Sequence, residues 1–264
     1  MYSFETIQLE HVDGQQSIVI LTLNRPQSLN AMNTKMALEL IDVFHQLEDN
    51  DTVRAVILTG TGTKSFCVGA DLKERNNMTK KDWKKQHAYF EEVTERIRNF
   101  PYPVIAAVNG FALGGGFEIA LSCDLRIGTE NAQVGLPEAK VGLIPGIGGT
   151  QLIARAVPTG IAKEMLFTGR RMSVIEASRW GIFNHVYSSD TYLQQTIELV
   201  ITIVGNAPLP LQALKKVVNK GTETDLSTGL ALELEAYYHC ANSEDRMEGI
   251  SAFNEKRAPE WKCS

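Results

Sequence analysis

Apolar residues follow two different spacings along the chain, one typical of buried strands and one typical of amphipathic helices. Short runs rich in β-branched and other apolar residues predict strands, at 17–26, 53–60, 103–110 and 123–129. Apolar positions that recur every three or four residues predict helices, at 33–50, 79–100 and 115–122. Strands and helices therefore alternate, and this order predicts an α/β fold with a largely parallel sheet and βαβ crossovers.

The pattern changes after about residue 190, where helical spacing continues almost to the end of the chain. The predicted helices there cover 191–205, 208–220, 224–241 and 244–254. We therefore predict two parts, a core of residues 1–190 that carries any active site and a C-terminal helical region of residues 191–264.

The charge balance bears on the kind of partner that the chain can bind. Its 264 residues carry a formal net charge of −5, with a pI near 5.6. Because no basic excess is present to neutralise phosphates, the composition argues against a nucleic-acid-binding protein. An anionic ligand must therefore meet a local basic patch.

The cysteines and the N-terminal segment bear on location. Four scattered cysteines, without C-x-x-C pairs or zinc-ligand spacing, are typical of reduced thiols and predict a cytoplasmic protein. The first residues include Glu5, Glu10 and Asp13 and do not resemble a signal peptide. No apolar run reaches the roughly 18 residues that span a membrane, so we expect no membrane association.

The first candidate for chemistry is the segment GFALGGGFEIA at 110–120. A predicted helix begins among its three glycines, where the first backbone N–H groups have no partner within the helix. Without a Cβ in the way, the N–H of Gly115 is a candidate donor to a ligand oxygen. Glu118 follows within the first turn, among apolar neighbours that would raise its pKa toward the range useful for proton transfer. A tight turn that packs the helix on the sheet is the alternative explanation of the glycines.

Two more segments offer matching chemistry. In FCVGADLKER (66–75), a glycine breaks an apolar run, and the N–H of Ala70 is a second candidate donor. In VGLPEAKVGLIPGIGGTQ (134–151), Glu138 is again flanked by apolar residues. One strand and its return fit between Glu118 and Glu138, so both carboxylates can face one cleft. Such a pair beside two backbone donors is suited to proton transfer next to an activated carbonyl.

These segments, together with LNRPQSLNAMN and SEDRMEGISAFNEKRAPEW, resemble the crotonase, or enoyl-CoA hydratase, family along nearly the whole chain. The resemblance implies a crotonase-like spiral of ββα units, with a C-terminal helical region that associates into a trimer or a hexamer of two trimers. It also implies an acyl-CoA thioester as substrate. Neither a metal nor a separate cofactor is expected, because coenzyme A is part of the substrate.

Carried over position by position, the resemblance gives roles to five residues. The N–H groups of Ala70 and Gly115 would form the oxyanion hole for the thioester carbonyl. Glu118 would act as base toward the attacking water, and Glu138 would give a proton to the α-carbon, completing a syn addition across the 2,3 double bond. The N–H of Gly146 would hold that water or Glu138 in place.

The resemblance also suggests which residues contact coenzyme A and the acyl group. Because the chain is acidic overall, local cations must meet the phosphates. The suggested positions are Arg25, Val68, Asp71, Leu72, Lys73 and, from a neighbouring subunit, Lys256, with Phe253 near the adenine end.

The presence of both Glu118 and Glu138 favours a hydratase that converts 2-enoyl-CoA to 3-hydroxyacyl-CoA. One alternative is a Δ3,Δ2-enoyl-CoA isomerase, which would survive loss of Glu118 but not of Glu138. RNA binding and a noncatalytic scaffold are further alternatives. The acidic helix predicted near 34–50 argues against the first, and the two glutamates argue against the second.

A methylglutaconyl-CoA hydratase is the remaining alternative, since the segment GADLKERNNM and the C-terminal motif resemble that branch of the family. A substrate with a distal carboxylate would need a cation in the acyl pocket. Four lysines lie on the helix expected to cover that pocket, Lys80, Lys81, Lys84 and Lys85. A solvated basic helix face explains them equally well.

Overall fold

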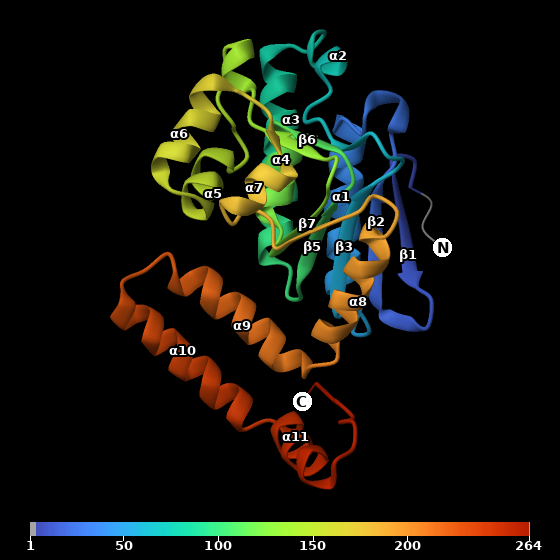
Figure 1. Ribbon diagram of the computed structural model, residues 1–264, viewed down its shortest axis with the longest axis vertical. Helices are drawn as coiled ribbons and strands as arrows, with labels where there is room; N and C mark the ends of the chain where they lie inside the picture. The colour runs from blue at the N-terminus through green and yellow to red at the C-terminus, as the bar shows by residue number, and fades with distance from the viewer. Residues whose placement is uncertain (1–3, 264) are drawn as a thin grey trace.

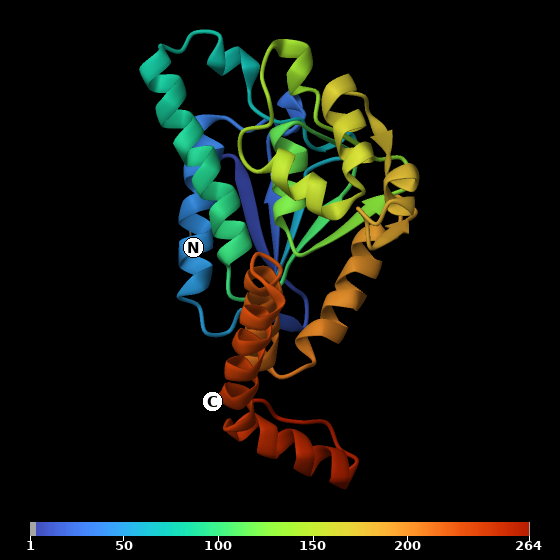
Figure 2. The same cartoon turned by 90° about the vertical axis from the view of Figure 1, so that its left-hand side faces the viewer.

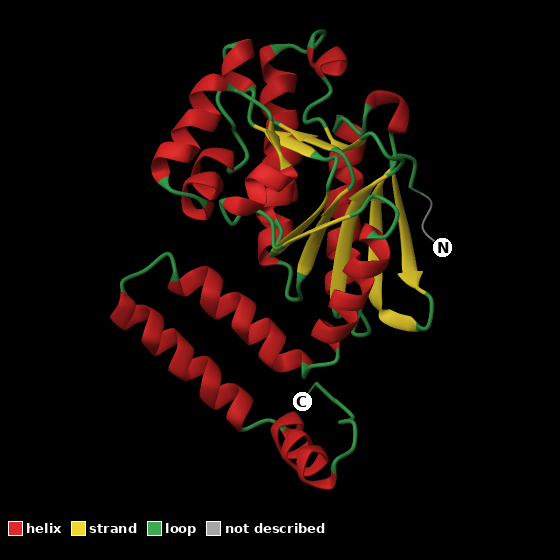
Figure 3. Cartoon of the chain, viewed as in Figure 1, coloured by secondary structure: helices red, strands yellow, loops and turns green. Residues whose placement is uncertain are grey.

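Two β-sheets form the centre of the computed structural model, which describes residues 4–263 (Figures 1 and 3). The larger sheet has the strand order β1 (Ile7–Val12), β2 (Gln15–Leu23), β3 (Ala55–Gly60), β5 (Val104–Val108), β7 (Leu125–Thr129) and β10 (His185–Tyr187). The smaller sheet has the order β4 (Ser65–Cys67), β6 (Phe111–Leu113), β8 (Gln133–Gly135) and β9 (Met172–Ser173).

Most neighbouring strands run parallel, as predicted. Among the described strands of the larger sheet, only the pair β1 and β2 is antiparallel. In the smaller sheet β4, β6 and β8 are parallel, and β9 is antiparallel to β8. The predicted α/β class is therefore confirmed.

The helices around the sheets include all those that the apolar spacing predicted. The core carries α1 (Thr34–Glu48), α2 (Leu72–Arg75), α3 (Lys80–Asn99), α4 (Gly115–Ser122), α5 (Gly149–Ala156), α6 (Thr159–Thr168) and α7 (Val174–Arg179). Two 3-10 helices, η1 (Pro26–Ser28) and η2 (Glu138–Val141), lie in its loops. The C-terminal part contains α8 (Tyr192–Val204), α9 (Pro208–Gly221), α10 (Leu226–Ala241) and α11 (Glu244–Glu255).

A strand–strand–helix unit recurs three times in the core. Strands β3, β5 and β7 each enter the larger sheet, and the strand that follows each of them, β4, β6 and β8, enters the smaller one. Helical segments, α2 with α3, α4, and η2 with α5, then lead to the next unit. The chain therefore winds as a spiral of ββα units, and the carboxyl ends of the short strands deliver their loops to one region.

Alternate side chains of the larger sheet belong to two different cores. On β2, Val19 and Leu21 pack with α1 and α3, whereas Ile18 and Ile20 face the other side. That second side is covered by α8, which contributes the buried Val200. Because both faces are covered, every residue of β3 is buried, and the strand carries a continuous apolar run at 55–58 rather than an alternating pattern.

Helices α9, α10 and α11 extend away from the sheets, while α8 lies against the larger sheet (Figures 1 and 2). Several large apolar side chains on these extended helices are exposed, including Leu214, Leu230, Leu234, Tyr237 and Phe253. The division of the chain after residue 190 stays a prediction. Within residues 4–263 no single helix is long and apolar enough to cross a membrane, although α8 and α9 together reach that length and hydropathy across a bend of 103°.

Candidate active site

A cavity of about 530 Å³ lies where the loops of the small sheet meet α3 and α4. The segment from Val68 through α2 forms one wall, and one side of the first half of α3 forms another. The start of α4, η2 and the loop before α5 complete it. The structure brings together the five residues to which the resemblance assigns roles, because this one cavity is lined by Ala70, Gly115, Glu118, Glu138 and Gly146.

Two backbone N–H groups face the cavity without an acceptor within residues 4–263. The residues on either side of Ala70 are fixed by Met32, whose N–H donates to Gly69 O at 2.8 Å and whose carbonyl accepts from Asp71 N at 2.9 Å. This parallel bridge leaves the N–H of Ala70 pointing to the opposite side. Gly115 is the first residue of α4, so its N–H has no acceptor within the helix. A Cβ built on Gly115 would lie 3.9 Å from the Ala70 nitrogen, which places the two donors side by side.

The glycines on either side of Gly115 meet separate steric demands. Gly114 has a φ of +52°, and a Cβ there would lie 2.9 Å from Oε1 of Glu138. A Cβ on Gly116 would overlap the carbonyl oxygen of Cys67 on β4. The glycine run therefore serves both purposes considered from the sequence: Gly116 lets α4 pack closely on β4, and Gly115 leaves its N–H accessible to a ligand.

Glu118 is buried in the first turn of α4, with 3% of its surface exposed. Its Oε1 accepts from the backbone N–H groups of Ile147 at 2.9 Å and Gly149 at 2.7 Å. Burial raises the pKa of this carboxyl, and the two backbone hydrogen bonds oppose the rise in part. Since both bonds fall on Oε1, the other oxygen has no protein partner in the described chain.

Glu138 begins η2 and presents its carboxyl to the same cavity. Burial raises its pKa to about 7, and the charge of Glu118 adds to the effect. Its Oε2 is buried and has no hydrogen-bond partner within residues 4–263. Because few hydrogen bonds stabilise its charged form, this carboxyl holds a proton near neutral pH and can act as a general acid.

The loop before α5 places Gly146 against His87 of α3. A Cβ on Gly146 would lie 2.7 Å from Cε1 of His87, so only glycine fits without moving the ring. The backbone of Gly146 is also close enough to Glu118 to oppose the rise in its pKa. His87 Nε2 lies 3.3 Å from Oε1 of Glu91. The role predicted for Gly146 in holding water or Glu138 stays a prediction.

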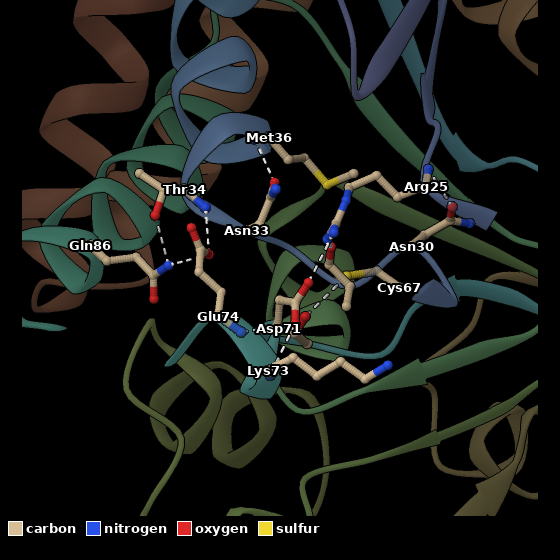
Figure 4. Close-up of polar contacts among 12 residues, drawn as sticks. Arg25, Asn30, Asn33, Thr34, Met36, Cys67, Asp71, Lys73, Glu74 and Gln86 are labelled. Carbon is tan, nitrogen blue, oxygen red and sulfur yellow. Dashed lines mark hydrogen bonds and ion pairs between the residues drawn. The ribbon is translucent and has the colours of Figure 1, made fainter. Parts of the chain in front are cut away.

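The predicted contacts to coenzyme A occupy different surroundings (Figure 4). Arg25 is already paired, with Nη2 at 2.9 Å from Oδ2 of Asp71 and Nη1 donating to Ala31 O at 2.6 Å. Asp71 also caps α2 by accepting from Lys73 N at 3.1 Å. The ammonium of Lys73 is exposed and has no dashed contact in Figure 4. The Arg25–Asp71 pair thus holds the loop that carries Ala70, and Lys73 extends into solvent.

The other predicted contacts are divided between the cavity and α11. Val68 and Leu72 line the cavity. Phe253 and Lys256 lie at the end of α11, far from the cavity of their own chain (Figure 1). Phe253 is 84% exposed. Their contact with coenzyme A, which the resemblance assigns to a neighbouring subunit, stays a prediction.

Four cavity residues on α2 and α3 were not among those predicted from the sequence. Arg75, Trp83, His87 and Phe90 line the cavity, and of the four lysines proposed earlier only Lys84 does so. Trp83, His87 and Phe90 are spaced i, i+4 and i+7, which is the spacing of one helix face. That spacing could have indicated which side of α3 faces the cavity.

Comparison with known proteins decides the family. The family model for enoyl-CoA hydratase/isomerase matches residues 13–264. The chain belongs to the enoyl-CoA hydratase/isomerase family. It is 41% identical to the short-chain-enoyl-CoA hydratase of Clostridium acetobutylicum, over 93% of this chain and 94% of that protein. It is 40% identical to the carnitinyl-CoA dehydratase of Proteus mirabilis, over 96% of this chain and 97% of that protein.

The fold of this chain is also similar to that of a solved member of the family. The crystal structure of the enoyl-CoA hydratase from Bacillus anthracis matches with a TM-score of 0.96 and 38% identity, over 98% of this chain and all of that chain. The predicted crotonase-like fold is therefore confirmed, and the chain is an enzyme of the hydratase/isomerase family. Relatives of nearly equal identity carry different acyl names, so overall similarity leaves the acyl group open.

Proposed function

We propose that this enzyme is an enoyl-CoA hydratase, which adds water syn across the 2,3 double bond of a 2-enoyl-CoA thioester to give 3-hydroxyacyl-CoA. The observation that carries the proposal is the presence of two buried glutamates and two unpaired backbone donors on one cavity. Coenzyme A enters as part of the substrate, and the proposal needs no other cofactor.

The two N–H groups act on the thioester carbonyl. When the Ala70 and Gly115 N–H groups donate to its oxygen, they stabilise the negative charge that develops there as water adds to the β-carbon. The donors are fixed by the Met32 bridge and by the start of α4, so they do not have to reorganise during the reaction. Loss of one such donor reduces kcat by about 100- to 1000-fold in other enzymes.

The two carboxyls divide the proton transfers. Glu118 is held through Oε1 by two backbone donors, which leaves Oε2 for the attacking water and its proton. Glu138, with a pKa of about 7, delivers a proton to the α-carbon of the enolate. The water oxygen thus bonds to the β-carbon, one proton moves to Glu118, and one leaves Glu138. Each positioned carboxyl contributes about 10²- to 10⁴-fold.

The decisive experiment is hydration of crotonyl-CoA by the wild type and by Glu118→Gln and Glu138→Gln. Both variants should lose at least about 100-fold in kcat/KM, while their elution on gel filtration stays that of the wild type. Glu130→Gln, which changes an exposed carboxylate after β7, serves as matched control and should hydrate normally. Near-normal hydration by either active-site variant would show that the assigned roles are wrong.

A Δ3,Δ2-enoyl-CoA isomerase is the competing function, because it moves a proton between two carbons and needs no water. The same variants separate the two activities when 3-hexenoyl-CoA is the substrate. An isomerase would keep its turnover in Glu118→Gln and lose it in Glu138→Gln. The two backbone bonds to Oε1 of Glu118 favour the hydratase, since they leave the other oxygen able to bind a water.

A further inference from the structure

Arg75 stands out among the positively charged residues of the cavity because its side chain is partly buried, whereas Lys84 and Lys140 are exposed. The side chain is partly buried at the end of α2, and it lines the same cavity as Glu118 and Glu138. Within residues 4–263 no ion pair joins its guanidinium to a carboxylate. A charge removed from water is normally paired, so a partly buried cation facing a cavity indicates that an anionic group completes its surroundings.

The guanidinium is also held in one place. Its Cζ lies 4.6 Å from the ring centroid of Trp83 and 5.0 Å from that of Phe90. Its Nε donates to Oε1 of Gln86 at 2.8 Å. These contacts fix the plane of the group while leaving both Nη atoms without a partner in the described chain, and two parallel N–H donors match the two oxygens of a carboxylate.

Glu74, the residue before Arg75, makes no ion pair with it, and its charge only partly offsets the lowering of the Arg75 pKa by burial. The Oε2 atom of Glu74 instead accepts from Gln86 Nε2 at 2.7 Å and from Thr34 N at 2.9 Å (Figure 4). The buried Gln86 therefore bonds Glu74 with its amide nitrogen and Arg75 with its amide oxygen. This arrangement separates the two charges and orients the cation.

We propose that Arg75 binds a carboxylate at the far end of the acyl chain, so that the enzyme selects CoA thioesters of dicarboxylic acyl groups. The inference rests on the proposed function, because it takes the cavity beside the two glutamates as the acyl site. Lys84 lines the same cavity and adds a second, more exposed positive charge. The aromatic walls that Trp83 and Phe90 supply suit the methylene groups between the thioester and the carboxylate.

Binding of unreactive, saturated thioesters tests this inference independently of catalysis. Succinyl-, glutaryl- and adipyl-CoA are each paired with a neutral ester in which an isopropyl group replaces the terminal carboxylate, as 5-methylhexanoyl-CoA does for glutaryl-CoA. Calorimetry should show at least one dicarboxylic ester binding about 10- to 100-fold more tightly than its neutral partner. In Arg75→Met that ratio should fall to about 1, and Arg75→Lys should restore part of it.

Arg171→Met is the matched control, since Arg171 also stacks on a ring, 5.0 Å from the centroid of Phe111, but lies outside the cavity. It should keep the wild-type ratio. If Arg75→Met weakens both members of each pair equally, the residue supports the structure or contacts the CoA moiety and the inference is wrong. It is also wrong if the wild type prefers no dicarboxylic ester. Crotonyl-CoA hydration, measured in parallel, reports on the proposed function alone, so the two can fail separately.

Discussion

Because the pKa of Glu138 is raised, the free energy of unfolding of the enzyme should fall as pH rises. The Glu138→Gln variant should lack this contribution. The fold favours the protonated carboxyl, because burial and the Glu118 charge disfavour the ionised form. The stabilising contribution is therefore fully present below the ordinary pKa of 4.5 and is lost as pH rises through about 7. Glutamine has the same shape and does not titrate, so the stability of the variant should not fall in this way as pH rises.

The magnitude follows from the size of the pKa change. A move from 4.5 to about 7 corresponds to about 3 kcal/mol in the free energy of unfolding. Solvent reaches part of the carboxyl, so we expect roughly 2 kcal/mol after screening. Any cost of placing an amide group where Oε2 has no partner is the same at every pH and does not affect the comparison.

Urea denaturation of both proteins at pH 5, 6, 7 and 8 measures the effect. Protein concentration must be equal throughout, because self-association would add to the apparent stability. The unfolding free energy of Glu138→Gln minus that of the wild type should rise by roughly 2 kcal/mol from pH 5 to pH 8. Glu130→Gln, which removes an exposed carboxylate outside the cavity, is measured alongside as the matched control. A constant difference for Glu138→Gln would refute the reasoning, because it would mean that Glu138 titrates alike in the folded and unfolded chain.

Two further substitutions test the packing of the site and the extended helices. Gly116→Ala should destabilise the enzyme by roughly 1–3 kcal/mol and reduce crotonyl-CoA hydration, because its Cβ would overlap the Cys67 carbonyl oxygen. Urea denaturation and turnover measure the two effects. The control Gly160→Ala, whose Cβ meets nothing within 4 Å, should be neutral or stabilising. Leu230→Glu places a charge on the exposed apolar surface of α10 and should lower the molar mass measured by light scattering. Leu38→Glu, at an exposed position of α1, should leave the mass unchanged. An unchanged mass for Leu230→Glu would contradict self-association through α10.

The parts of the fold that the sequence predicted are those with a long or continuous pattern. The 20-residue helix α3 and the buried strand β3 were placed to within a few residues, because each repeats one spacing over several positions. The smaller sheet was missed, since β4, β6 and β8 are only three residues long and show no period. Their partners lie far away in sequence, so only tertiary pairing defines them.

The part of the site that consists of backbone N–H groups could be predicted from the sequence. Glycine runs mark places where an N–H is bare, and this is visible in the sequence around Gly115 and Ala70. The surroundings of Arg75 are not visible, because they depend on where Trp83 and Phe90 of another helix come to lie. The lysines of α3 are conspicuous in the sequence because of their charge, but the cation that is held against two aromatic rings, Arg75, belongs to α2.

The two glutamates illustrate why burial alone does not decide the role of a carboxyl. Glu118 is the more buried of the two, but backbone N–H groups of Ile147 and Gly149 support its charged form. Glu138 has a buried oxygen without any partner in the described chain, and its pKa reaches about 7. Gly149 at the start of α5 allows this close approach, since a Cβ there would lie 2.8 Å from the Cγ of Glu118. The loop that admits Glu118 to its N–H groups thus keeps one carboxyl ready to accept a proton while its neighbour is ready to donate one.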